Sequence, residues 1–137
     1  MGARAKGLLQ WAIRRELLWQ WENDIADVED LDMAIFFGPG VRWATQGFLT
    51  AIDMGGLDIA CATGTNLLKD MDDSKTVVPK MLALRDAGHL GLKTGKGFFE
   101  YAEEDRKNIK DAYVRRLVRQ LSTMHDHLKT MKVQEKK

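Results

Sequence analysis

A glycine-rich stretch between residues 91 and 101 constrains the fold of this chain more than any other feature. Gly91, Gly95 and Gly97 fall at odd positions, two lysines lie between them, and the aromatic run Phe98 to Tyr101 follows. Each glycine costs roughly 1 kcal/mol relative to alanine in a helix interior, so this density excludes a stable helix. The stretch is therefore predicted to be a fixed, non-helical crossing between two helical regions.

The rest of the chain follows helical periodicity. Apolar residues recur every three or four positions, and the alternation typical of strands is confined to the brief aromatic run. The predicted helices cover approximately residues 5–22, 28–37, 48–54, 57–68, 79–86 and 103–132. Gly38, Pro39 and Gly40 stop the second helix, so a loop is predicted before the third. The sequence thus predicts an all-α fold of about six helices, with residues 1–137 forming one domain and residues 103–132 a long last helix.

The amino-acid composition limits the classes of protein to which this chain can belong. The chain of 137 residues holds 21 Lys and Arg against 20 Asp and Glu, and 45% of it is hydrophobic. This balance is typical of a soluble globular domain and makes no case for nucleic acid binding. No apolar run approaches the roughly 20 residues that a membrane span needs. The lone cysteine, Cys61, excludes an internal disulfide and favours a cytoplasmic location, and a buried small thiol is a simpler interpretation of it than a nucleophile.

Two predicted helices carry more apolar surface than one small core needs. In the first helix, the large side chains that widen the main stripe are Trp11, Leu18 and Trp19. Either this helix packs on two of its sides, or part of its surface meets a second domain or subunit. In the last helix, a seam of coiled-coil type includes Leu117, Leu121, Met124 and Leu128. Its outer half either packs across a subunit interface or frays, and we assign both sets of residues to a candidate homodimer interface.

No catalytic, cofactor-binding or metal-binding set is predicted in this chain. The segment 95–97 lacks the spacing, the preceding strand and the following helix of a phosphate-binding loop, and no G-x-G-x-x-G fingerprint offers a seat for NAD. His125 and His127 lie two apart on a helix and make a poor metal pair. His89 lies in a loop, where a surface role is the simpler interpretation. Residues 70–75 form an acidic segment without the glycine and closing glutamate of a calcium loop, so a solvated loop is predicted.

Four segments, in this order and spacing, resemble the C-terminal helical domain of the 3-hydroxyacyl-CoA dehydrogenases, with the 3-hydroxybutyryl-CoA type looking closest. They are DVEDLDMA (27–34), FFGPGVRW (36–43), QGFLTAIDMGGLDIA (46–60) and AGHLGLKTGKGFFEY (87–101). The resemblance runs from about Leu9 to Tyr101. It implies an all-α domain similar to the helical dimerisation domain at the C-terminus of 6-phosphogluconate dehydrogenase.

The resemblance also implies a function. Full-length members place a Rossmann NAD domain, with the catalytic His–Glu pair, before the helical domain. That domain is absent here, so NAD is expected only in the full-length enzyme, with the Rossmann domain in the same or a separate chain. The helical domain would form the dimer and close one side of the acyl-CoA cleft in an NAD-dependent dehydrogenase of fatty-acid metabolism, and it would be inactive alone. The resemblance assigns the cleft to Gly38, Pro39, Gly40, Arg42, Gly47, Asp53 and Lys93.

The chain departs from the family pattern at three places. The family motif G-x-x-x-N-R opens the first helix, but Lys6 or Gly7 stands where its substrate-holding asparagine is expected. The family turn Gly-Pro-Phe/Leu-Glu is here residues 47–50, without the proline or the acid, and Ala44 replaces a common proline. The alternative function is therefore a stand-alone, non-catalytic helical oligomerisation module descended from that domain.

Overall fold

The computed structural model describes the backbone of residues 2–134 and the side chains of residues 2–45 and 47–122. Within that range, helices follow one another with no strand between them, and the only β-type pairing is two isolated bridges near residues 91–100. The elements are α1 (Ala3–Glu22), α2 (Val28–Ile35), the π-helical turn η1 (Phe36–Gly40), α3 (Val41–Gln46), α4 (Phe48–Gly55), α5 (Leu57–Leu67), α6 (Pro79–Asp86) and α7 (Glu103–Gln134). The all-α prediction is confirmed.

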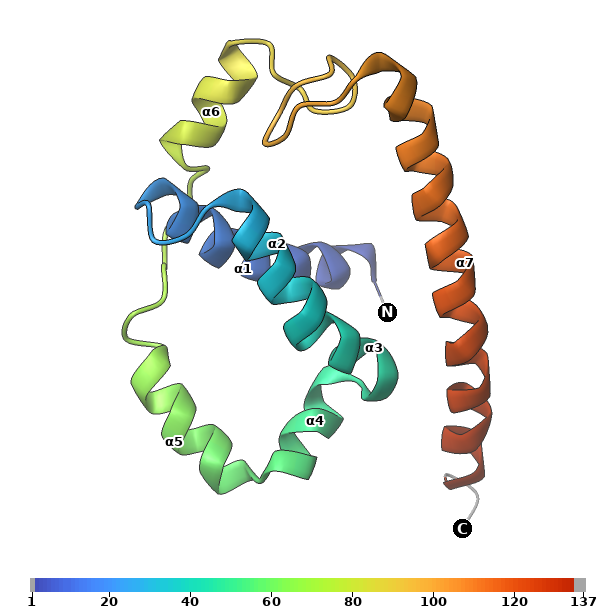
Figure 1. Ribbon diagram of the computed structural model, residues 1–137. Coiled ribbons are helices and arrows are strands. Elements are labelled where there is room, and N and C mark those ends of the chain that lie inside the picture. The colour runs from blue at the N-terminus through green and yellow to red at the C-terminus, as the bar shows by residue number, and fades with distance from the viewer. Residues whose placement is uncertain (1, 135–137) are drawn as a thin grey trace.

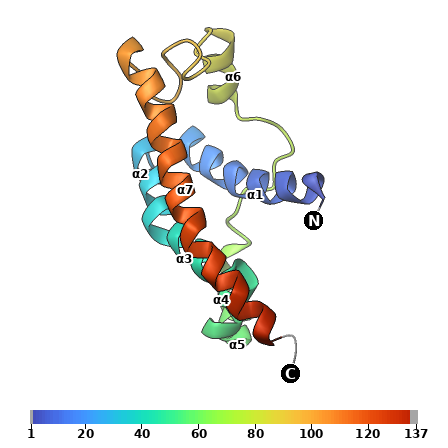
Figure 2. The same cartoon turned by 90° about the vertical axis from the view of Figure 1, so that its right-hand side faces the viewer.

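The helices form an open frame and not a set of layers around one core (Figure 1). Helices α1 and α2 cross in the middle, α3 and α4 continue from α2, and α5 turns back toward the connector that rejoins α6. After a 90° turn, α7 is seen to run along one side of the other helices (Figure 2). Among the described side chains, only Leu31 and Val78 form a buried hydrophobic core.

This open frame leaves an unusually large surface. The chain exposes 11348 Å², whereas a compact monomer of 15.6 kDa is expected to expose about 7,300 Å². The difference is roughly 4,000 Å². Large apolar side chains occur throughout the exposed surface, from α1 to α7. The fold therefore presents apolar faces that its own helices do not cover.

The loop predicted after the second helix is wrong, because the chain stays helical through η1 and α3. Gly38 alone leaves the helical region, with φ −91° and ψ −113°, since a residue before proline avoids that region. Pro39 then opens the next helical turn, where its missing N–H costs little. A side chain at Gly40 would place its Cβ 2.7 Å from the Ile35 carbonyl oxygen, so glycine permits this close approach. The Gly-Pro-Gly segment is a kink between helices.

The glycine loop, residues 91–101, is the non-helical crossing that the sequence predicts. Gly91 and Gly95 have φ of 74° and 83°, in the left-handed region that favours glycine. The Gly91 N–H donates to the carbonyl oxygen of Lys96 at 2.8 Å, which closes the loop on itself. A Cβ on Gly97 would lie 2.7 Å from the Gly91 Cα, closer than a side chain allows. Backbone contacts therefore hold the loop in shape.

Most of the acidic connector between α5 and α6 is exposed, as predicted for residues 70–75, but Asp72 and Ser74 are held against α1. The Asp72 N–H donates to the Glu16 carboxylate at 3.0 Å, and the Ser74 hydroxyl donates to the Asp72 carboxylate at 2.6 Å. The Arg15 guanidinium lies 4.0 Å from the same carboxylate. The Asp72 side chain is 8% exposed as a result. These contacts join positions far apart in sequence and fix the path by which the chain returns to α1.

The hydrogen-bonded Asp72 carboxylate makes the stability of the chain depend on pH. The hydrogen bond from the Ser74 hydroxyl lowers the pKa of Asp72 more than burial raises it, and Arg15 adds a smaller lowering effect. Because the unfolded chain has the higher pKa, it binds more protons as the pH falls. The stabilisation is therefore present above the ordinary value of 3.8 and is lost as the pH falls through the folded pKa. Asp72→Asn is expected to weaken this acid dependence of the urea midpoint.

The exposed neighbour Asp73 offers a matched control, because Asp73→Asn removes the same charge one residue away. We expect the acid dependence of the urea midpoint to survive in Asp73→Asn. An equal loss in both variants would contradict the role of the Ser74 hydrogen bond.

Candidate functional site

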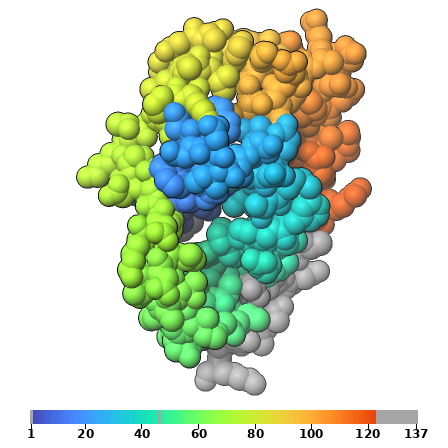
Figure 3. All heavy atoms as spheres, turned by 60° about the vertical axis from the view of Figure 1, so that its left-hand side comes forward, coloured from blue at the N-terminus to red at the C-terminus, as the bar shows by residue number. Residues whose placement is uncertain are grey.

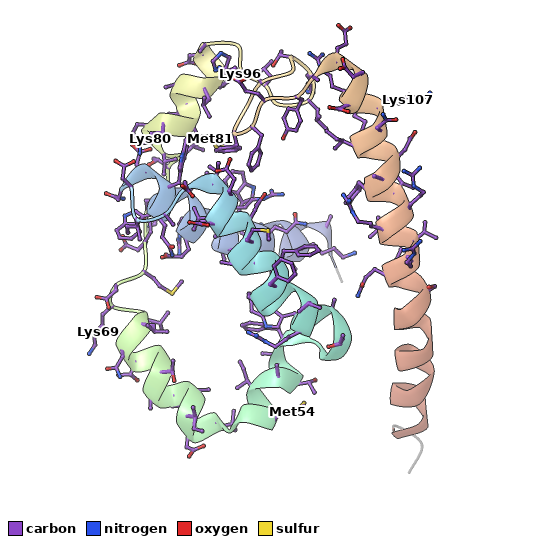
Figure 4. The ribbon with its side chains drawn as sticks, in the orientation of Figure 1. Met54, Lys69, Lys80, Met81, Lys96 and Lys107 are labelled. Atoms are coloured by element: carbon purple, nitrogen blue, oxygen red, sulfur yellow. The ribbon has the colours of Figure 1, made fainter. Side chains whose placement is uncertain are left out.

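An apolar groove of about 280 Å³ lies between α1, α2, α6 and the glycine loop, and we call it the first groove. Residues on its walls include Trp11, Leu18, Trp21, Leu31, Met81 and Phe98. Trp11, Leu18 and Trp21 face one way because positions seven and three apart share a helix face. Figure 4 shows Met81 at the base of α6, beside α1. The groove is a place where α1 can receive an apolar group.

Aromatic packing fixes the upper wall of the first groove. The rings of Trp21 and Phe98 meet edge to face, with centroids 5.1 Å apart, an arrangement worth about 0.5–1.5 kcal/mol beyond the area it buries. Lys80, next to Met81 in Figure 4, lies 5.6 Å from the centre of the Trp21 ring and donates to the Trp21 carbonyl oxygen at 2.9 Å. The Lys80 N–H also donates to the Glu22 carboxylate at 2.8 Å. These contacts fasten α6 and the glycine loop to the end of α1.

A second groove, of about 480 Å³, lies on the other side of α1, against the connector. Leu8, Trp11, Arg15 and Leu18 form its helical wall, and Val77 and Val78 belong to the opposite wall. Trp11 and Leu18 border both grooves. The large apolar side chains that widen the stripe on α1 therefore contribute to both open grooves.

The residues assigned to the substrate cleft are spread over two parts of the molecule. The kink in η1 consists of Gly38, Pro39 and Gly40. Arg42 is exposed on α3, Gly47 joins α3 to α4 with φ 81°, and Asp53 is exposed on α4. Lys93 is exposed in the glycine loop. The glycine loop and α4 lie at opposite ends of the molecule in both ribbon views. This chain thus groups the residues from η1 to α4 along one continuous segment and holds Lys93 apart from them. None of these residues borders the two grooves.

The residues assigned to the dimer interface retain accessible apolar surface. Trp11 is 45% exposed and Leu18 and Trp19 are half-buried, all on α1. On α7, Leu117 is 41% and Leu121 52% exposed. Met124 and Leu128 also fall on α7, but their side chains lie outside the described residues. Cys61 is exposed on α5, so the prediction that its thiol is buried is wrong.

The described residues offer little chemistry of their own. No group of three His, Cys, Asp or Glu side chains within residues 2–122 is placed to hold a metal ion. The charged groups at the first groove are Arg14 and Asp32, which lack a nucleophile and a base to act with. The Nδ1 atom of His89 is enclosed and unpaired in the part of the chain that is described. Glu100 lies near enough to interact with His89 electrostatically, but its carboxylate is exposed and paired with the Lys96 ammonium. No helix within residues 2–134 is long and apolar enough to cross a bilayer.

The described residues form an all-α domain with open apolar grooves and exposed helix faces. Comparison with known families identifies the family of this domain. The model of the 3-hydroxyacyl-CoA dehydrogenase C-terminal domain matches residues 9–101, and the chain belongs to that family. The resemblance that the four segments indicate is thereby confirmed.

Two curated relatives and one solved structure are similar to the chain. The 5-formyl-3-hydroxy-2-methylpyridine 4-carboxylate 5-dehydrogenase of Mesorhizobium japonicum is 33% identical over 108 residues, which are 79% of this chain and 35% of the relative. The L-carnitine dehydrogenase of Bacillus cereus is 47% identical over 49 residues, which are 35% of this chain and 15% of the relative. A crystal structure of a 5-formyl-3-hydroxy-2-methylpyridine 4-carboxylic acid 5-dehydrogenase, described as an NAD⁺-dependent dismutase, is 32% identical with a TM-score of 0.80. That match covers 82% of this chain and 37% of the solved chain. This chain therefore spans about a third of the length of the pyridine carboxylate dehydrogenases that it matches.

Proposed function

We propose that this chain is the helical C-terminal domain of an NAD-dependent dehydrogenase that oxidises an alcohol carbon. Its role in that enzyme is to associate subunits and to shape one side of the substrate cleft. The family match over residues 9–101 carries the proposal. The large accessible surface of 11348 Å² supports it, because a domain built for association leaves its contact faces open when alone.

The described residues do not fit the nicotinamide cofactor by themselves. A dinucleotide is bound where a glycine-rich turn joins a strand to the start of a helix. The glycine loop has only isolated bridges, and its Gly91 N–H is used within the loop. The Lys96 ammonium is paired with the Glu100 carboxylate at 2.6 Å. In the proposed enzyme NAD therefore belongs to a Rossmann domain outside residues 1–137, and we assign no reaction step to these residues.

A 3-hydroxyacyl-CoA is the first candidate substrate, following the description of the family. In this proposal the segment from η1 to α4 faces the acyl-CoA cleft, with Arg42 as an exposed cation beside the kink. The enzyme would work in fatty-acid metabolism in the cytoplasm. A small free carboxylate is the second candidate, because the two relatives are named for a pyridine carboxylate and for carnitine.

A homodimer is the proposed assembly, with the exposed faces of α1 and α7 as contact surfaces. The residues that support this are Trp11, Leu117 and Leu121, which keep large accessible areas. Complete burial of one such side chain in the interface would stabilise the dimer by about 1.5–3 kcal/mol. A second subunit would gain this stabilisation without changing the fold of either chain.

The isolated chain is expected to be inactive, and this is the test of the proposed function. Purified residues 1–137 mixed with NAD and either 3-hydroxybutyryl-CoA or L-carnitine should yield no NADH. In the reverse direction, the same chain mixed with NADH and acetoacetyl-CoA should consume no NADH. A full-length 3-hydroxybutyryl-CoA dehydrogenase, assayed alongside, shows that the reagents work. Turnover by the isolated chain would refute the assignment of catalysis to another domain.

A stand-alone oligomerisation module is the second candidate function. Lys6 or Gly7 in place of the family asparagine and Thr50 in place of the family acid favour it, because both losses fall in the substrate-handling motifs. The upstream reading frame separates the two candidates. A segment encoding G-x-G-x-x-G supports the dehydrogenase, and its absence supports the module.

A further inference from the structure

The first groove is a cavity to which the proposed function gives no role. It measures about 280 Å³ and lies between α1, α2, α6 and the glycine loop, whose surfaces meet in the upper half of Figure 3. None of the residues assigned to the substrate cleft borders it. Sites for small molecules are mostly apolar cavities of about 300–1,000 Å³ with a few polar groups, so the first groove suits a small ligand in size and lining.

Contacts within the chain hold the walls of the first groove in place before any ligand arrives. Leu31 is 8% exposed, and the rings of Trp21 and Phe98 meet edge to face with centroids 5.1 Å apart. The Lys80 ammonium donates to the Trp21 carbonyl oxygen at 2.9 Å, which fixes α6 beside these rings. Phe98 nevertheless keeps 42% of its surface exposed. An apolar ligand would bury this surface without the ordering cost that a flexible site imposes.

Arg14 gives the first groove an available positive charge. Its guanidinium carbon lies 5.6 Å from the centre of the Trp11 ring, and both residues border the groove. Within residues 2–122, no acid forms an ion pair with Arg14, and this includes Asp32, the acid at the groove. A planar guanidinium can bind a carboxylate through two parallel hydrogen bonds and stack on an aromatic ring at the same time. Arg14 can therefore hold the carboxylate of a ligand while it remains on Trp11.

The charges around the aromatic rings favour an anionic ligand over a cationic one. The faces of tryptophan rings attract cations, but Arg14 already lies over Trp11. Lys80 lies over the Trp21 ring in the same way, also at 5.6 Å from the ring centre. A cationic ligand would displace one of these groups or meet the positive charge of both. Asp32 is exposed on α2, where water and salt screen its charge. A ligand carboxylate is therefore directed to the α1 side of the groove, toward Arg14.

We propose that the first groove binds a small apolar carboxylate, with its hydrocarbon part against Trp21 and Phe98 and its carboxylate on Arg14. The anion of a medium-chain fatty acid has this chemistry. The site is separate from the cleft proposed for the segment from η1 to α4, so its ligand is an addition to the substrate of the proposed enzyme. The inference goes beyond the proposed function and holds whether or not the chain belongs to a dehydrogenase.

Three probes with the same alkyl chain test the proposal, namely octanoate, neutral 1-octanol and cationic octylammonium. Titration calorimetry is expected to show that octanoate binds the chain at least tenfold more tightly than octylammonium does. Arg14→Gln is expected to weaken octanoate binding by tenfold or more and to change 1-octanol binding by less than twofold. Arg4→Gln is the matched control, because Arg4 is an exposed cation of α1 that borders neither groove. Octanoate should bind this variant as tightly as it binds the unaltered chain.

Methionine methyl resonances locate the ligand without any substitution. Met81 borders the first groove, whereas Met54 is 71% exposed near the end of α4, far from Met81 in Figure 4. In a chain labelled with carbon-13 at the methionine methyl groups, octanoate is expected to shift the Met81 signal and to leave the Met54 signal unchanged.

Three results would overturn the proposal: equal affinity for octanoate and octylammonium, undiminished octanoate binding by Arg14→Gln, or a Met81 signal that octanoate does not shift. A Met81 signal that changes only with protein concentration would mean that another copy covers the groove, and it would overturn the proposal as well. None of these measurements uses NAD or turnover, so failure here is distinguishable from failure of the proposed enzyme.

Discussion

Gly97→Ala is expected to destabilise the domain by about 3 kcal/mol, the upper end of the usual cost of overpacking. The new Cβ would lie 2.7 Å from the Cα and 2.9 Å from the N of Gly91, and both are backbone atoms that cannot turn aside. Relief requires the glycine loop to open, which pulls Phe98 away from Trp21 and the first groove. Urea denaturation followed by tryptophan fluorescence measures the loss.

Gly7→Ala is the matched control for that substitution. Gly7 lies within α1, and a Cβ there would have no atom within 4 Å. Alanine is favoured over glycine in a helix by about 1 kcal/mol, so this variant is expected to be slightly more stable than the unaltered chain. A Gly97→Ala variant as stable as the unaltered chain would show that the loop is not fixed by this close approach.

Leu31→Ala is expected to cost about 2–4 kcal/mol, because it empties one of the few core positions. Leu31 is 8% exposed on α2 and borders the first groove, so its loss separates α2 from α1. Met33, on the same helix, is 52% exposed, and Met33→Ala is expected to change the stability of the isolated chain by less than about 0.5 kcal/mol. The urea midpoints of the two variants measure the difference. Equal losses in both would mean that Leu31 is not a core residue.

Elements with strong local patterns could be predicted from the sequence. The helices at residues 3–22 and 103–134 follow from apolar spacing, and the glycine loop follows from glycine density. Helix α3 could not be predicted, because Gly38 and Pro39 are signals of a loop when considered alone. Whether such a segment ends a helix or bends it depends on the fit of Gly40 against Ile35, a contact that single-residue preferences do not describe.

A candidate contact surface could be predicted from the sequence only where a single helix carries more large apolar side chains than one core needs. Trp11 exceeds what one core needs, so the sequence alone pointed to a contact surface on α1, where the structure has two grooves. The pinning of Asp72 to α1 joins residues 56 positions apart, and a run of acids gives no local sign of that contact. The exposure of α5 was not predicted, because its apolar residues have the spacing of an ordinary core helix. Their lack of a partner becomes visible only in three dimensions.

Thermal unfolding of the chain at two protein concentrations, each with and without NAD, tests the central claim most directly. The claim is that this domain is completed by a second copy and not by a nucleotide. If the dimer unfolds as it dissociates, a hundredfold rise in protein concentration stabilises the folded dimer by about 2.7 kcal/mol. For two chains of this length the unfolding temperature should then rise by about 5 °C, with no change on addition of NAD. A temperature that is independent of protein concentration but rises with NAD would contradict the account.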